Sequence, residues 1–243
     1  MKSVAALLIL SCVLKAQTQA PVRVEYACPA EDVESFGLGC SPDDPCAVFL
    51  EIASVEAVGA KLFLAGNLHA ETTTLYGIVL ESEDGGKSWT EAVKRVRSAA
   101  FEQIEFFDFS RGWISGQIIE PLARDPFMLL SADGGTSWTE RPLFDEPRFG
   151  SIAQFWFDSP QHGELVLDSD GEPPRHERYE SNTGGESWEM KQSTTEAIHL
   201  KTNKSTAWRV RADAATKTYH VERRAGSSWE TVASFLIHVA DCK

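Results

Sequence analysis

An eight-residue pattern recurs through the chain at a nearly constant spacing, and it restricts the possible fold more than any other feature. Residues 82–89 read Ser-Glu-Asp-Gly-Gly-Lys-Ser-Trp, and related octets follow at 131–138 and 181–188. A shorter fourth version covers 225–229. Spacings of 49, 50 and 41 residues separate the terminal tryptophans, which are Trp89, Trp138, Trp188 and Trp229. A period of this size indicates a repeat architecture in which each repeat is one supersecondary unit.

Each repeat also contains short runs of aromatic and β-branched residues. In the second repeat these runs are Gln103–Phe109, Gly112–Ile118, Pro126–Ser131 and Ser137–Leu143. They are separated by turn residues and are too short for helices, so they predict strands. A further similarity matches Phe106–Ser110 with Phe155–Ser159 in the next repeat.

Four antiparallel strands in a period of about 40–50 residues are typical of a propeller blade. The octets divide the chain into units near 47–97, 98–147, 148–196 and 197–241. We therefore predict an all-β fold, a small β-propeller of four four-stranded blades over 47–243. A five-bladed ring and an open array completed by dimerisation are the alternatives.

The residue types of the octet suit a tight turn between the third and fourth strands of a blade. Paired glycines permit positive φ at little steric cost, the aspartate accepts backbone N–H bonds, and the tryptophan packs a large apolar area. A calcium or catalytic role would need more than one carboxylate per turn, and Thr183 replaces the aspartate of the third copy. The residues with this expected structural role are Ser82, Asp84, Gly85, Gly86, Trp89, Ser131, Asp133, Gly134, Gly135, Trp138, Ser181, Gly184, Gly185 and Trp188.

The octet resembles the Asp-box, or BNR repeat, of β-propellers. Two copies match its pattern in full and the third lacks only the aspartate. The rhythm of Phe107, Asp108, Gly112, Trp113 and Gly116 is most similar to the repeat of the Ycf48/HCF136 photosystem II assembly factors, and sialidases resemble the chain more distantly. This resemblance implies a propeller fold and a role in protein–protein interaction or complex assembly.

The first twenty residues have the layout of a secretory signal. Lys2 precedes an apolar run from Val4 to Leu14, and small and polar residues follow up to Ala20. That run is about half of the ~20 apolar residues that a membrane span requires, so we predict no transmembrane segment. Cys12 lies in a sequence that loosely resembles a bacterial lipobox and is a possible lipidation site. We expect an extracytoplasmic protein, secreted or periplasmic.

Four further cysteines indicate two disulfides. Cys28, Cys40 and Cys46 lie in an N-terminal segment, 21–46, whereas Cys242 is the penultimate residue. An even number of cysteines in a secreted chain favours a disulfide framework, and the spacing matches no usual zinc pattern. Because 47–241 holds no cysteine, any bridge to Cys242 must tie the chain ends together. We also expect Val22–Tyr26 to add a strand to the last blade.

Charge and motifs limit the functional classes. The net charge is −13, from 23 Lys and Arg against 36 Asp and Glu, which disfavours nucleic acid as a partner. A sialidase would need an arginine triad and a Tyr–Glu pair, and no such framework is recognisable. We predict no cofactor, no metal site and no catalytic residues. Asp168–Glu172 is better interpreted as a charged hairpin loop than as part of a calcium loop, and we expect His199, His220 and His238 in strands.

Two functional hypotheses follow. The first is a non-catalytic scaffold that binds an unknown protein partner through loops on a rigid frame. The second is a carbohydrate-active protein, either a lectin or a glycoside hydrolase that uses two carboxylates.

Overall fold

The computed structural model describes residues 20–169, 171–202 and 207–243. The proposed signal segment up to residue 19, with Cys12, lies outside these ranges, and so does the sequon at 203–205. Among the described residues no helix combines the length and apolar character needed to cross a bilayer.

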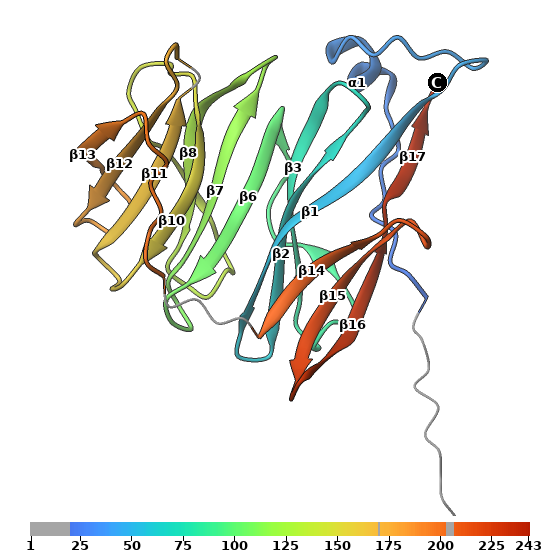
Figure 1. Ribbon diagram of the computed structural model, residues 1–243. Coiled ribbons are helices and arrows are strands. Elements are labelled where there is room, and N and C mark those ends of the chain that lie inside the picture. Colours follow the sequence, from blue (N-terminus) through green and yellow to red (C-terminus); the bar gives the residue numbers. More distant parts are fainter. Residues whose placement is uncertain (1–19, 170, 203–206) are drawn as a thin grey trace, which may run out of the picture.

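The chain is nearly all β, and its antiparallel sheets are arranged like the blades of a propeller (Figure 1), as predicted. Blade 1 consists of β1 (Cys46–Val58), β2 (Lys61–His69), β3 (Thr74–Ser82) and the short β4 (Thr90–Glu91) and β5 (Val96–Arg97). Blade 2 consists of β6 (Ala99–Phe106), β7 (Gly112–Ile119), β8 (Ala123–Ser131) and β9 (Thr139–Pro142). Blade 3 consists of β10 (Ser151–Phe157), β11 (Gly163–Ser169), β12 (Arg175–Ser181) and β13 (Glu189–Thr194).

Blade 4 differs from the prediction because its sheet has three strands. These are β14 (Trp208–Asp213), β15 (Thr218–Ala225) and β16 (Ser228–Leu236). The chain then continues into β17 (His238–Cys242), which pairs with β1 of blade 1 and not with its own blade. His220 and His238 lie in strands as expected, whereas His199 lies outside them, in the connection from blade 3 to blade 4.

The two chain ends meet where blade 1 adjoins blade 4. Cys242 is opposite Cys46 in the antiparallel β1–β17 ladder and forms a disulfide with Cys28, which confirms the predicted tie between the ends. Cys40 and Cys46 form the second bridge. The expected N-terminal strand on the last blade is reduced to one parallel bridge, between Val22 and Phe235 of β16.

The N-terminal segment is held against blade 1 by buried polar contacts. It contains the short helix α1 (Ala30–Ser35). Asp32 of this helix is 6% exposed and accepts hydrogen bonds from Tyr26 Oη at 2.6 Å and Tyr76 Oη at 2.8 Å. The Arg97 guanidinium lies 3.6 Å from the ring centroid of Phe36. These contacts fix the loop after α1 above the end of blade 1.

Hydrophobic clusters connect neighbouring blades one after another. One cluster combines blades 1 and 4 with the N-terminal segment, a second combines blades 1 and 2, and a third combines blades 2 and 3. Within the described ranges no such cluster joins blade 3 to blade 4. The reason is visible in β14 and β15: Val210 and Val221 pack toward blade 1, while Arg209, Arg211 and Glu222 occupy the opposite face as ion pairs of 2.6 and 3.1 Å.

Candidate functional site

The octet of blade 1 forms a closed turn, in which the aspartate accepts hydrogen bonds from other residues of the same turn. Asp84 accepts hydrogen bonds from the backbone N–H groups of Lys87 and Ser88, both at 2.9 Å, and from Ser88 Oγ at 2.6 Å. Ser82 Oγ donates to Asp84 and accepts from Gly86 N–H at 2.8 Å. These bonds to the ionised form hold the pKa of Asp84 far below its usual range.

The second and third copies repeat this turn with one change. In blade 2, Asp133 accepts from Ser137 N–H at 2.9 Å and from Ser137 Oγ at 2.6 Å. In blade 3, Thr183 Oγ1 takes over the acceptor role toward Ser187 N–H at 2.9 Å. A neutral hydroxyl therefore replaces the carboxylate without opening the turn, which favours the structural interpretation of the octet.

The second glycine of each octet lies where the turn meets the neighbouring blade. A Cβ atom on Gly135 would lie 2.4 Å from Phe63 Cζ, and one on Gly185 would lie 3.2 Å from Trp113 Nε1. Phe63 and Trp113 belong to the second strands of blades 1 and 2, so each turn packs against the preceding blade. A side chain at the glycine position would push the blades apart.

Aromatic side chains add to these contacts between blades. Their positions also show that one match between repeats needs correction. Phe106 stacks on Phe63 with centroids 5.1 Å apart, and Phe157 stacks on Trp113 with centroids 3.7 Å apart. Phe106 therefore corresponds to Phe157. The match of Phe106 with Phe155 that the sequence predicts is wrong by two residues. A shift of two residues keeps the same strand face, so the aromatic pattern alone does not reveal it.

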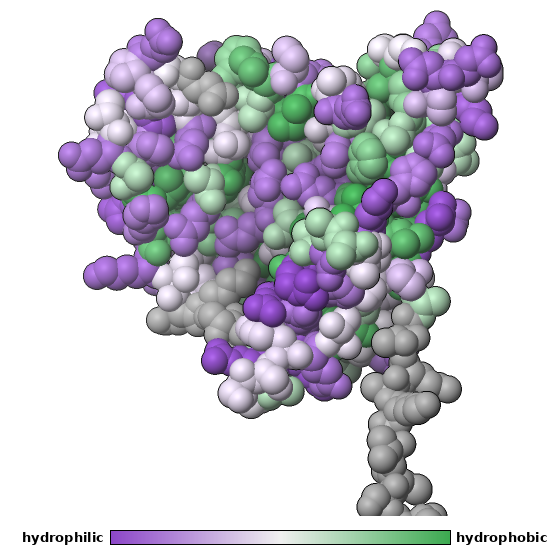
Figure 2. Space-filling view, turned by 45° about the vertical axis from the view of Figure 1, so that its right-hand side comes forward, coloured by the Kyte–Doolittle hydropathy of each residue, from purple (hydrophilic) through white to green (hydrophobic). Residues whose placement is uncertain are grey.

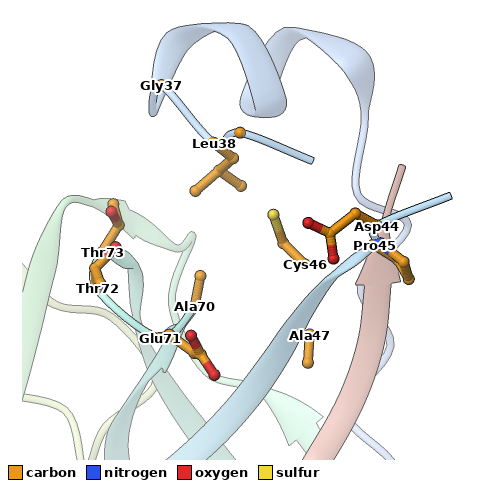
Figure 3. Close-up of a pocket in the computed structure, with 11 residues that line it drawn as sticks. Gly37, Leu38, Asp44, Pro45, Cys46, Ala47, Ala70, Glu71, Thr72 and Thr73 are labelled. Atoms are coloured by element: carbon orange, nitrogen blue, oxygen red, sulfur yellow. The ribbon is translucent and has the colours of Figure 1, made fainter. Parts of the chain in front are cut away.

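A pocket lies at the opposite end of blade 1, under the loop after α1 (Figure 3). Its volume is about 330 Å³, and its walls come from 37–39, 44–47 and the turn 70–73 between β2 and β3. Asp44 and Glu71 lie on different sides of it, and Leu38 lies above them (Figure 3). The Cys40–Cys46 bridge closes the loop that carries Asp44.

A second pocket of about 360 Å³ adjoins the first on the other side of the same turn, between blades 1 and 2. Glu51 of β1 and Glu102 of β6 line it. Asn67, which is 5% exposed, donates to Glu51 at 3.0 Å, and Gln117, which is 3% exposed, donates to Glu102 at 3.1 Å. Neutral amides on the neighbouring strands thus orient both carboxylates.

We call the two pockets together the acidic cleft, defined by Asp44, Glu51, Glu71 and Glu102. Among the described residues that line the two pockets there is no lysine or arginine, and His69 is the only basic side chain. Desolvation, and then the negative charge of Glu51, raise the pKa of Glu102 above its usual value, while the bond from Gln117 opposes this shift. The cleft therefore favours a positively charged ligand.

Sequence analysis did not find these residues. Glu51 and Glu102 lie in different repeats and are separated by about fifty positions with no shared motif. The one available signal was that each lies in the first strand of its blade, next to hydrophobic residues. The described side chains that the sequence singled out lie in the octet turns, in contacts between blades and in the two disulfide bridges.

Other sequence-derived candidates do not assemble into a centre. Asp168 contacts His176 Nδ1 at 2.5 Å across the β11–β12 hairpin, and Asp170 lies outside the described residues. Over the described ranges, no group of three or more His, Cys, Asp or Glu side chains is placed to hold a metal ion.

The fold defines the chain as a propeller-like β protein with an acidic cleft that extends from the end of its first blade to the second blade. Its solved structural neighbours include "YCF48 bound to D1 peptide", with 22% identity and a TM-score of 0.42, covering 77% of this chain and 55% of that one. YCF48 from Cyanidioschyzon merolae has 18% identity and a TM-score of 0.39, covering 75% and 59%. The α-L-arabinofuranosidase Arb93A from Fusarium graminearum has 13% identity and a TM-score of 0.41, covering 79% and 62%.

These likenesses concern the architecture alone. The chain spans less than two thirds of the length of each of these three structures. No protein-family model and no curated protein matches the chain. The Asp-box assignment therefore stays a prediction from the three octets.

Proposed function

We propose that this protein is an extracytoplasmic, non-catalytic scaffold that binds a basic segment of a partner protein in the acidic cleft. The observation that carries this proposal is the meeting of four carboxylates in two adjoining pockets, with no lysine or arginine in the part of their lining that the structure describes. The two disulfides support a location outside the cytoplasm, because such bridges persist in oxidising compartments.

The strands that carry the carboxylates of the cleft form a rigid frame, which suits recognition of an extended segment. Glu51 and Glu102 belong to strands whose blades are joined by a buried cluster that includes Phe63, Phe101 and Ile104. A rigid frame loses little conformational entropy when a ligand binds. Figure 2 shows hydrophilic residues interspersed with hydrophobic ones over the surface. The net charge of −13 favours an electrostatically steered encounter with a basic segment.

Binding of synthetic peptides tests the proposal. A ten-residue labelled peptide with four lysines is titrated by fluorescence anisotropy, alongside a peptide in which glutamates replace the lysines. We expect only the basic peptide to bind, with an affinity that falls as salt rises from 50 to 300 mM. Replacing Glu51, Glu71 and Glu102 together by glutamine should weaken binding at least tenfold.

The control variant removes the same number of charges elsewhere. Glu140, Glu189 and Glu230 lie exposed on β9, β13 and β16, and their replacement by glutamine should leave the affinity within twofold. Equal losses in the two triple variants would mean that only net charge matters, and the proposed cleft would then be wrong.

A carbohydrate-active role is the second candidate, and the Glu51–Glu102 pair is the observation that favours it. Glycoside hydrolysis uses two neighbouring carboxyl groups in unequal environments, one as general acid and the other as general base. Hydrolysis of chromogenic glycosides that disappears in Glu102→Gln would support this role. Hydrolysis unaffected by that change would exclude the pair as its catalytic residues.

A further inference from the structure

The two disulfides lie next to each other, where the N-terminal segment meets β1 and β17. Cys46 of β1 and Cys242 of β17 are directly opposite each other in the antiparallel ladder. Cys46 is bonded to Cys40, and Cys242 is bonded to Cys28. All four cysteines belong to one hydrophobic cluster. Neither the octets nor the proposed partner binding gives a reason for two adjacent bridges.

The strand register permits a third bond, between Cys46 and Cys242. Side chains of directly opposite residues in an antiparallel pair lie on the same face, and their Cα atoms are about 4.5–5.5 Å apart. Disulfides usually join Cα atoms about 4.4–6.8 Å apart, and the two bridges of this protein span 5.3 and 5.2 Å. The ladder therefore holds Cys46 and Cys242 at a separation that suits a disulfide, without any movement of the strands.

The sulfur atoms of Cys46 and Cys242 differ in their access to solvent. The Cys46 sulfur points into the pocket under the loop after α1 (Figure 3), and Cys40 and Cys46 are both partly exposed. Cys242 is 0% exposed. A thiol in solution therefore reaches the Cys40–Cys46 bridge, whereas the Cys242 sulfur is open to attack only from a neighbouring group of the protein.

We propose that these cysteines undergo thiol–disulfide exchange, with Cys46 as the attacking group. A dithiol reductant first reduces the Cys40–Cys46 bond, so that the reductant becomes a disulfide and Cys40 and Cys46 become thiols. The Cys46 thiol loses its proton to solvent, and the thiolate attacks Cys242 Sγ. The Cys46–Cys242 bond forms, the Cys28–Cys242 bond breaks, and Cys28 leaves as a thiolate that takes up a proton. The dithiol supplies both electrons and both protons of the net change.

Exchange would free the N-terminal segment and still leave the two terminal strands bonded. β1 and β17 stay joined through the new bond, while 28–45 loses both of its covalent anchors. Cys28 has φ of +46°, a left-handed conformation that is unfavourable for a residue with a side chain, and this favours its release. The freed segment includes 37–39 and Asp44, which form one wall of the acidic cleft. Control of partner binding by the exchange rests on the proposed function, whereas the exchange itself does not.

The variant Cys40→Ser tests the exchange without a reductant, because it leaves Cys46 as a free thiol opposite Cys242. The folded variant is incubated at pH 8, its free thiols are trapped with N-ethylmaleimide, and its bridges are mapped by mass spectrometry of non-reduced peptides. We expect at least half of the molecules to contain the Cys46–Cys242 bond and a trapped Cys28. The double variant Cys40→Ser/Cys46→Ser is the matched control, and its Cys28–Cys242 bond should remain intact.

The wild type supplies the second measurement. Treatment with one equivalent of dithiothreitol should give the Cys46–Cys242 bond, with Cys28 and Cys40 trapped. Trapping of Cys40 and Cys46 beside an intact Cys28–Cys242 bond would overturn the proposal, and so would Cys28–Cys242 as the sole bond in Cys40→Ser. If circular dichroism shows that the variant does not fold, the wild-type map decides. Because the readout is a pattern of bonds, failure of the basic peptide to bind leaves this test unaffected.

Discussion

Replacement of Gly135 by alanine tests how the octet turns join the blades. Gly135 has φ of +81°, and a Cβ atom there would lie 2.4 Å from Cζ and 2.7 Å from Cε1 of Phe63. Phe63 is fully buried and stacked on Phe106, so its ring has no free space to move into. The left-handed conformation costs about 1–2 kcal/mol in a residue with a side chain, and overpacking adds about 1–3 kcal/mol.

The expected loss is therefore about 2–5 kcal/mol in the free energy of unfolding. Gly85→Ala is the control, because Gly85 has φ of +72° with nothing within 4 Å of its added Cβ, so only the backbone cost of about 1–2 kcal/mol applies. Urea unfolding monitored by fluorescence gives both values if the m-values agree. In a Phe63→Leu background, the cost of Gly135→Ala should fall toward that of Gly85→Ala, with a remainder from Phe106 Cζ, which would lie 3.3 Å from the added Cβ. Equal losses for Gly135→Ala and Gly85→Ala in the wild-type background would refute the packing argument.

Three further predictions concern the disulfides and one tyrosine. Loss of the Cys28–Cys242 bridge, which links residues 214 apart, should destabilise the protein by about 5 kcal/mol in the chain-entropy model. Loss of the Cys40–Cys46 bridge, six residues apart, should cost about 2 kcal/mol, and urea unfolding of serine double variants with m-values checked gives both numbers. Burial, and then the bond to Glu177, raise the pKa of Tyr179 to about 12 from 10.0. The stability that its neutral form contributes is present below pH 10 and lost as pH rises toward 12, because the unfolded chain ionises first, and Tyr179→Phe should remove this part of the alkaline stability loss.

The fold could be predicted because the same local rules recur in each blade. The octet needs positive φ at paired glycines, and Gly85, Gly134 and Gly184 all adopt it. The period between the octets gave the blade boundaries. The strands of blade 2 agree with their predicted ranges within a few residues, except that Phe107 and Phe109 belong to the following loop.

The pairing of the last strand with the first blade, at the chain ends, could not be predicted from local patterns. Residues after Leu236 read as a continuation of the last blade, yet β17 crosses to blade 1 and pairs with β1. The cysteines predicted that the two chain ends are tied together, but not that β17 pairs with β1 so that Cys242 lies opposite Cys46. The blade 4 sheet is consequently one strand short of the regular pattern.

The acidic cleft escaped prediction for a related reason. Glu102 lies at an irregularity of the β6–β7 register, between Phe101 and Gln103, where an extra residue turns a side chain away from the regular alternation. The alternation of side chains along β6 therefore does not predict which way the Glu102 side chain points. Its proximity to Glu51 arises only from the packing of β6 against β1, β2 and β3.

Hydrogen–deuterium exchange of the protein, alone and with the basic peptide, tests the central claim most directly. The account predicts slower exchange on binding at the turn 70–73 and at 100–102, with little change in β9 and β13 at the outer edges of blades 2 and 3. Protection confined to those outer edges, or to the octet turns, would contradict the placement of the partner in the acidic cleft.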